Sequence, residues 1–191
     1  MINRLKQCVP RSWKRMLKKG GRNLIESPQY YRERPVKMAQ SPETVIFVCK
    51  GNICRSAFAE FYLKKVLTKG HFLVESCGIE VDQGNFSPPE AIQVAKRYGV
   101  DMTEHRSKGM SRCDIEGESL ILPMEYPQYR ALLERFPEKR DHIRLLREFT
   151  PGYARLFCNI YDPFGQNEQA FALCFQQVAM AVDGLVKTVL T

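Results

Sequence analysis

The chain has 191 residues, of which 44% are hydrophobic and 26% are charged, enough for one globular domain with an extension. No apolar run approaches the roughly 18 residues that span a bilayer, and the basic N-terminal segment lacks the apolar stretch of a secretory signal. The net charge of +8 is uneven: residues 1–40 carry +9 and the other 151 residues carry −1, which favours neither a basic enzyme surface nor a nucleic-acid-binding domain.

Residues 1–40 are expected to form a basic, partly ordered extension. They show no sustained hydrophobic period, and Pro10 would interrupt a helix early. Such an extension suits weak contact with an anionic membrane surface or with a protein partner. The more ordinary alternatives are an unstructured tail or a cap folded on the domain. A short apolar stripe on a basic helix would be formed by Leu5, Cys8, Trp13, Met16 and Leu17.

From residue 44 onward, strand-like and helix-like segments alternate. TVIFVC at residues 44–49 is a continuous apolar, β-branched run, which is typical of a buried parallel strand. The alternation predicts one α/β domain over residues 41–191, three-layered and doubly wound, with about four parallel strands and helices on both faces. Further strands are expected at residues 72–76, 119–123 and 142–146. Helices are expected at residues 57–68, 89–98, 128–136 and about 167–189.

The segment CKGNICRS, at residues 49–56, joins the first strand to the first helix of this domain. Ligands of open α/β sheets bind beyond the carboxyl ends of the strands, where successive backbone N–H groups and a helix dipole attract anions. Gly51 lets the backbone approach a ligand closely, and Asn52 tolerates a left-handed conformation. Arg55 supplies a planar fork that matches two phosphate oxygens. The segment therefore predicts a phosphate-binding loop after the first strand.

Cys49 is the candidate nucleophile of this loop. The N–H groups, the helix dipole and Arg55 are expected to stabilise its thiolate, which can attack a bound phosphorus atom. Ser56 can donate to the sulfur when the sulfur becomes a leaving group, and it can also cap the helix. The alternative is that Cys49 merely ends a buried strand and Arg55 is a surface charge, because a cysteine and an arginine at this spacing are weak signals alone.

VIFVCKGNICRS, at residues 45–56, is similar to the signature of the low-molecular-weight protein tyrosine phosphatase family. VESCG at 74–78, GVDMTEHRS at 99–107 and YDPF at 161–164 resemble later segments of that family in the same order. The resemblance runs from about residue 44 to the C-terminus. It implies a phosphatase without metal or cofactor that hydrolyses phosphotyrosine and other aryl phosphate monoesters through a cysteinyl-phosphate intermediate.

The resemblance also implies that Asp162 is the general acid. Asp162 would protonate the leaving phenolate and then act as base for the water that hydrolyses the intermediate, and Pro163 would stiffen its loop. The chemistry agrees, because a poor leaving group needs a proton and a positioned acid contributes ~10²–10⁴ in rate. Taken without the resemblance, an aspartate before a proline is as often a simple turn residue.

The family further suggests a set of residues that supports the loop by hydrogen bonds. Removing one of them should weaken catalysis without abolishing it. Ordinary alternatives are that Ser76 merely ends a strand and that His105 lies on the surface. A disulfide between Cys49 and Cys54 would protect the nucleophile from over-oxidation. The expected phosphate-binding and supporting residues are Lys50, Gly51, Asn52, Ile53, Cys54, Ser56, Ser76 and His105.

The walls of the substrate slot are less well defined by the sequence. Counting from Ser76 places Asp82 where the family usually has an aromatic or bulky apolar wall, and Phe86 takes that role if the loop is shifted. Phe164 or Tyr161 would form the other wall, with Phe164 as a core residue being the alternative. An aromatic wall favours a phenyl phosphate over a seryl phosphate.

Three other functions are retained as alternatives: a protein-arginine phosphatase, an arsenate reductase of the same fold, and a non-catalytic phosphate-binding regulatory module. Arginine phosphatases of this family tend to have threonine where Ile53 stands, so Ile53 favours a slot for tyrosine. Reductases need a relay of further cysteines near the nucleophile, and Cys77 and Cys113 are not expected to form a close pair on a mobile segment. The complete set of candidate catalytic residues argues against a non-catalytic module.

Cysteine usage and composition also shape the expected setting. The seven cysteines are scattered and form no C-x-x-C pairs, so neither a zinc site nor a disulfide framework is indicated, and reduced thiols in a cytoplasmic protein are expected. The expected partner is a protein that contains phosphotyrosine, such as a tyrosine kinase. No nucleic-acid partner is expected, and the protein is expected to be mostly monomeric.

Overall fold

A computed structural model describes residues 11–36, 42–67, 72–81, 84–115 and 117–190, with side chains from residue 21 onward. Its centre is a parallel sheet of three strands in the order β2-β1-β3, formed by β1 (Thr44–Cys49), β2 (Leu73–Gly78) and β3 (Ser119–Pro123). Every residue of β1 is buried, because this strand is paired on both sides and covered on both faces. The predicted parallel α/β fold is confirmed, and β1 and β3 have the predicted bounds.

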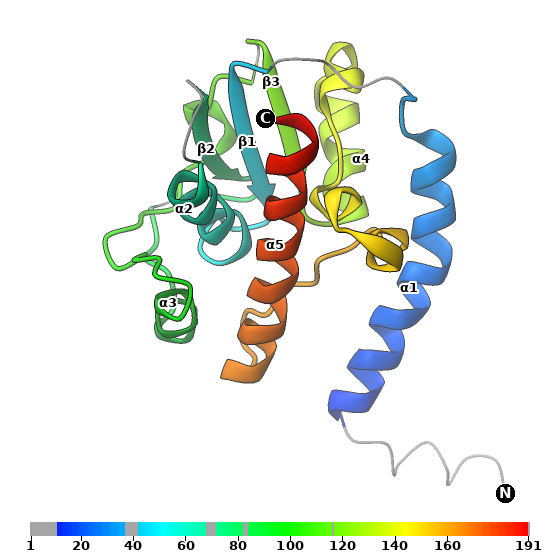
Figure 1. Cartoon of the computed structure of the whole chain (residues 1–191). Coiled ribbons are helices and arrows are strands. Elements are labelled where there is room, and N and C mark those ends of the chain that lie inside the picture. The colour runs from blue at the N-terminus through cyan, green and yellow to red at the C-terminus, as the bar shows by residue number, and fades with distance from the viewer. Residues whose placement is uncertain (1–10, 37–41, 68–71, 82–83, 116, 191) are drawn as a thin grey trace, which may run out of the picture.

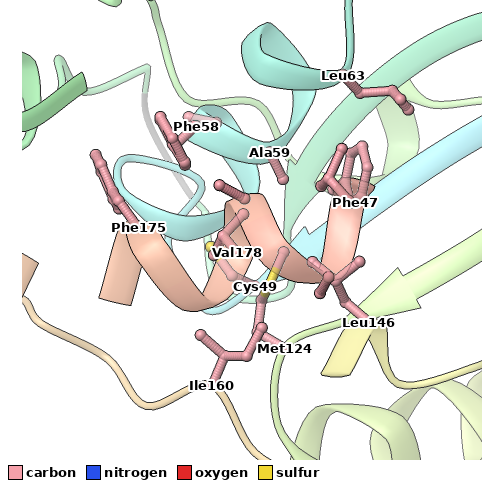
Figure 2. Packing of buried hydrophobic residues seen from close by; sticks show 14 of the residues in the cluster. Phe47, Cys49, Phe58, Ala59, Leu63, Met124, Leu146, Ile160, Phe175 and Val178 are labelled. Carbon is pink, nitrogen blue, oxygen red and sulfur yellow. The ribbon is translucent and has the colours of Figure 1, made fainter. Parts of the chain in front are cut away.

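Three helices cover one face of the sheet: α2 (Arg55–Val66), α3 (Pro89–Lys96) and α5 (Glu168–Val189). Phe58 of α2 and Phe175 of α5 stack with their ring centroids 4.0 Å apart and lie over Phe47 of β1 in the same buried cluster. Figure 2 shows Cys49 in this cluster, beside Val178 of α5. The candidate nucleophile is thus held within the hydrophobic core on this face of the sheet.

The other face is covered by α4 (Tyr126–Arg135) and by α1 (Arg11–Glu33), which lies beside α4 in Figure 1. Tyr30 of α1 is fully buried against Tyr129 of α4, with the ring centroids 5.1 Å apart. Its hydroxyl donates to Glu148 and accepts the N–H of Leu145 at 3.0 Å. The second half of α1 is therefore a cap folded on the domain, one of the arrangements that the sequence leaves open.

The predicted fourth strand, at residues 142–146, is wrong. Ile143 makes one isolated parallel bridge with Ile121 of β3, and the N–H of Arg144 donates to the Ile121 carbonyl at 3.0 Å. Two 3₁₀ helices, Pro137–His142 and Leu146–Phe149, flank this bridge. Only three residues remain extended between them, which is too few to continue a ladder. Two further 3₁₀ helices within the described part of the chain are Met110–Arg112 and Gly152–Leu156.

Helix α5 has 22 residues and a mean hydropathy of 1.3, so by length and composition alone it would be long and apolar enough to cross a membrane. In the structure its apolar side, including Phe171, Phe175 and Val182, is buried against the domain. Asn167 caps its N-terminus by accepting the N–H of Ala170 at 3.2 Å. These contacts make α5 the core helix of the α/β domain.

Candidate active site

Cys49 is the last residue of β1, and its sulfur lies at the start of the loop that enters α2. The side chain is 2% exposed. The Ser56 hydroxyl lies 3.0 Å from the sulfur, and the backbone N–H of Asn52 donates to it at 3.2 Å. The loop thus folds back over the sulfur, as expected for a nest of N–H groups around an anion.

Asn52 holds the loop in its conformation. Its φ of +50° lies in the left-handed region, where asparagine is among the few residues that are tolerated. The side-chain amide donates to Ser56 Oγ at 2.9 Å and to Ser76 Oγ at 2.7 Å, and its oxygen accepts the Lys108 N–H at 2.9 Å. The carbonyl of Asn52 lies 2.7 Å from His105 Nε2. The structure brings Asn52, Ser56, Ser76 and His105 together as predicted from the resemblance, with Asn52 at the centre.

Glu60 extends this network, and sequence reasoning missed it. Its carboxylate accepts the Ser76 hydroxyl at 2.5 Å, which orients the hydroxyl oxygen toward Asn52. Glu60 stands four residues after Ser56, so both lie on the buried side of α2. A glutamate on the same helix face as a predicted active-site serine was the available signal.

Gly78 is a second residue whose importance the sequence shows only indirectly. A Cβ at this position would lie 2.8 Å from the Lys50 carbonyl oxygen and 3.1 Å from the Asn52 nitrogen. The end of β2 therefore passes so close to the loop that only glycine fits without displacing the backbone. The backbone N–H groups of Ile79 and Glu80 then donate to the carbonyls of Cys49 and Lys50 at 3.0 and 2.9 Å.

Arg55 is 1% exposed, and its guanidinium is held by one edge. Nη1 donates to Glu125 Oε2 at 2.6 Å and to the Ile160 carbonyl at 2.9 Å, while Nη2 lies 2.9 Å from Asp162 Oδ2. Within the described part of the chain, the buried Nε has no hydrogen-bond partner. Nε and Nη2 form one edge of the guanidinium, the edge that can hold two phosphate oxygens.

Charge around Arg55 strengthens its cationic form. Burial by itself lowers the pKa of Arg55, but the negative groups at Cys49, Asp162 and Glu125 outweigh burial and raise the pKa above its ordinary value. The arginine therefore supplies a permanent positive charge next to the sulfur.

Glu125, the main anchor of Arg55, was also missed. It stands two residues after the end of β3 and caps α4 through a capping box with Gln128, whose side-chain oxygen accepts the Glu125 N–H at 3.2 Å. Its position just beyond the carboxyl end of a parallel strand was the signal that could have identified it.

Asp162 pairs with Nη2 of Arg55, whereas Glu125 pairs with Nη1, and the Asp162 side chain is 38% exposed. Its Oδ1 accepts the N–H of Phe164 at 3.2 Å, and its carbonyl accepts the side-chain amide of Gln166 at 2.7 Å. Asp162 is more than a hundred residues from Cys49 in sequence, yet the fold places it against Arg55, the arginine of the Cys49 loop. Its carboxylate is accessible to solvent.

The expected wall residues have different surroundings. Phe164 is 56% exposed, so it is not the buried core residue that was the alternative for this position. Phe86 is 49% exposed and lies against Arg106, whose guanidinium carbon is 3.2 Å from the ring centroid. Asp82 falls outside the described residues. Phe164, two residues from the acid, is the better placed of the described candidates.

The remaining loop residues divide between surface and core. Lys50 is exposed and pairs with Glu80 at 3.1 Å, Gly51 is half-buried, and Ile53 packs against the apolar cluster. Cys54 is buried, and burial, followed by the nearby Cys49, raises the pKa of its thiol. Both Cys49 and Cys54 are free thiols here, and their disulfide stays a prediction.

Cys77 and Cys113, the two cysteines weighed for a reductase relay, interact with each other. The Cys113 thiol donates to the Ser76 carbonyl at 3.7 Å. Its interaction with the Cys77 thiol is the main cause that raises the pKa of Cys77 and lowers the pKa of Cys113. However, Cys77 belongs to the cluster that packs under α4, whereas Cys49 belongs to the cluster on the opposite face of the sheet. The sheet separates this pair from the nucleophile.

Comparisons with known proteins agree with this geometry. Two relatives are the probable low molecular weight protein-tyrosine-phosphatase EpsP of Ralstonia nicotianae and the low molecular weight protein-tyrosine-phosphatase Wzb of Escherichia coli. EpsP is 31% identical over 144 residues, covering 75% of this chain and 94% of EpsP. Wzb is 32% identical over 131 residues, covering 69% of this chain and 84% of Wzb.

A solved structure, the YwlE arginine phosphatase from Geobacillus stearothermophilus, superposes with a TM-score of 0.68 at 29% identity, covering 76% of this chain and 92% of YwlE. The family model described as low molecular weight phosphotyrosine protein phosphatase matches residues 44–191, the range that holds the sheet, the loop and Asp162. The chain belongs to the low molecular weight phosphotyrosine protein phosphatase family.

Proposed function

We propose that this protein hydrolyses phosphotyrosine in proteins, with Cys49 as nucleophile, Arg55 as phosphate-binding residue and Asp162 as general acid. The observation that carries the proposal is the arrangement around Arg55. Nη1 of this buried arginine donates to Glu125 and to the Ile160 carbonyl, and its Nη2 pairs with Asp162. In the same loop, the Ser56 hydroxyl and the Asn52 N–H contact the Cys49 sulfur.

In the first step the Cys49 thiolate attacks phosphorus. A sulfur–phosphorus bond forms, the phosphorus–oxygen bond to the aryl group breaks, and Asp162 gives its proton to the leaving phenolate. In the second step water attacks phosphorus and passes a proton to Asp162, and the thiolate leaves. Ser56, 3.0 Å from the sulfur, can donate to the departing thiolate.

The ion pair between Asp162 and Arg55 has a consequence for this cycle. A phosphate dianion that binds the Nε and Nη2 edge of Arg55 competes with Asp162 Oδ2, which lies 2.9 Å from Nη2. Binding therefore releases the Asp162 carboxyl group from Arg55 and frees it to face the leaving group. The substrate itself would thus prepare the acid.

The preference for tyrosine over arginine rests on the slot. Ile53 at the loop is apolar, and the exposed Phe164 ring follows the acid, so an aryl group gains burial and stacking that a polar guanidinium does not. Protein-arginine phosphatase activity is the second candidate, because a protein-arginine-phosphatase of Geobacillus stearothermophilus is 29% identical over 150 residues. The separation of Cys77 and Cys113 from Cys49 by the sheet argues against an arsenate reductase relay.

Proposals about the cellular setting go with this function. The free thiols support a reducing, cytoplasmic location, and the names of the relatives EpsP and Wzb support a bacterial phosphotyrosine protein, such as a tyrosine kinase, as substrate. We further infer a mostly monomeric enzyme, with α1 available for weak contact with a partner.

The function is tested by phosphate release from an aryl phosphate in the presence of a chelator. The full-length protein should turn over phosphotyrosine peptide much faster than phosphoserine or phosphoarginine peptide. Cys49→Ser should abolish turnover, since an alkoxide is not available at neutral pH. Cys113→Ser, which changes a thiol on the other side of the sheet, is the matched control and should keep most activity. Ordinary activity in Cys49→Ser would refute the mechanism, and faster turnover of phosphoarginine would establish the second candidate.

A further inference from the structure

A chain of alternating charges connects α1 with the catalytic arginine. Arg22 Nε and Nη2 donate to the two carboxylate oxygens of Glu26, at 2.9 and 3.3 Å, and Arg22 Nη1 lies 3.4 Å from Glu125 Oε1. The other oxygen of Glu125 accepts Arg55 Nη1 at 2.6 Å. Glu125 therefore bridges two arginines, one from α1 and one from the phosphate loop.

Helix α1 also holds the second anchor of Arg55, the carbonyl of Ile160. Ser27 Oγ accepts the N–H of Cys158 at 3.1 Å, and the side-chain amide of Asn159 donates to Glu26 Oε2 at 2.6 Å. The backbone before Ile160 is thus tied to α1 at two consecutive residues. Both groups that fix Nη1 of Arg55 are thus tied, directly or through neighbouring residues, to successive turns of α1 between Arg22 and Ser27.

These contacts come from a helix outside the matched family range of residues 44–191. We propose that Arg22 is a positioning residue that fixes the catalytic Arg55 through Glu125. Arg22 makes its contact with the outer oxygen of Glu125 and so acts without touching the phosphate. The inference rests on the proposed phosphatase function.

The physical reason is the balance of charge at Glu125. With Arg22 in place, the carboxylate is shared by two cations and its orientation is fixed from both sides. Without Arg22, the same carboxylate turns toward Arg55 alone and leaves an excess negative charge near the phosphate site, which repels a dianion. The Arg22 side chain is 34% exposed, so water screens this interaction and the expected effect is moderate, roughly three- to tenfold.

Inorganic phosphate is the direct probe, with binding to the full-length protein measured by calorimetry. Arg22→Gln should raise the Kd of phosphate roughly three- to tenfold and lower kcat/KM for an aryl phosphate by a similar factor. Arg32→Gln removes the same charge from an exposed position on the same helix and is the matched control, expected to leave both values unchanged. Arg22→Lys, which keeps the charge but has a single donor group, should restore part of the affinity.

A double-mutant cycle separates positioning from general stabilisation. If Arg22 acts through Glu125, Arg22→Gln should have little further effect on phosphate affinity in the Glu125→Gln background. Additive losses, or a lower melting temperature in Arg22→Gln with unchanged phosphate affinity, would overturn the inference. Absence of aryl phosphate turnover in the wild-type protein would count against the proposed function alone, because phosphate affinity still tests Arg22.

Discussion

At the scale of single residues, the site depends on how Arg55 divides its donors. Nη1 is used for structure, since Glu125 and Ile160 hold it, and Nη2 is shared between Asp162 and an incoming phosphate. A buried guanidinium has no water to satisfy it, so each partner also removes the cost of an unpaired donor. In the proposed mechanism the same arginine thus fixes the loop, binds the substrate and holds Asp162 until the substrate arrives.

The acid role of Asp162 predicts a dependence on the leaving group. In Asp162→Asn, turnover of phenyl phosphate should fall by ~10²–10⁴, because the phenolate then leaves without a proton. Turnover of an aryl phosphate with a good leaving group, such as 4-nitrophenyl phosphate, should fall much less. Steady-state kinetics over a series of substituted phenyl phosphates provides the measurement and its own control. Equal losses across the series would remove Asp162 from the acid role.

At the scale of elements, the sequence predicts well the strands, helices and loop that local residue patterns determine. The continuous apolar runs of β1 and β3 predict buried strands, and residues 49–56 predict the loop because glycine, asparagine and arginine there each have a local reason. The predicted helices were all found, with ends shifted by up to a few residues.

What the sequence predicts poorly depends on contacts between distant segments. Residues 142–146 have strand-like composition, but the 3₁₀ helices on both sides leave them room for one bridge. The sequence leaves the docking of α1 open, because the partners of Tyr30, such as Tyr129 and Leu145, lie about a hundred residues away in sequence. Glu60 and Glu125 were missed for the same reason, since each is important only through a partner brought to it by the fold.

The docking of α1 predicts a specific loss of stability. The Tyr30 hydroxyl donates to Glu148 and accepts the buried N–H of Leu145, so Tyr30→Phe should lower the free energy of unfolding by ~1–3 kcal/mol. Tyr31→Phe is the control, because its hydroxyl donates to the Arg155 carbonyl in an exposed setting where water can replace it. Urea unfolding measures both. Equal, small losses would mean that α1 contributes little to the fold of the whole chain.

At the scale of the whole molecule, the positive charge of the protein is concentrated in residues 11–22, the N-terminal half of α1, which we call the basic arm. Residues 11–22 contain six basic residues and no acidic one, whereas residues 41–191 carry a net charge of −1. Figure 1 shows the N-terminal half of α1 extending past the sheet on the side toward which β1 points, the side of the phosphate loop. The basic arm, a helix segment on that side of the sheet, should attract acidic protein substrates and increase their association rate.

This arrangement predicts that substrate choice depends on salt. Kinetics should show a higher kcat/KM for a phosphotyrosine peptide with acidic flanks than for the same peptide with neutral flanks, and the ratio should fall as salt shortens the range of the charges. Substituting Lys14, Lys18 and Lys19 by glutamine should reduce the ratio at low salt roughly tenfold, because it removes half of the arm's six charges. The neutral peptide is the control, and its kcat/KM should stay nearly constant since the catalytic loop is unchanged. The substitutions could instead leave this kcat/KM ratio unchanged and abolish binding to anionic vesicles. That result would mean that residues 11–22 bind a membrane surface and not the substrate.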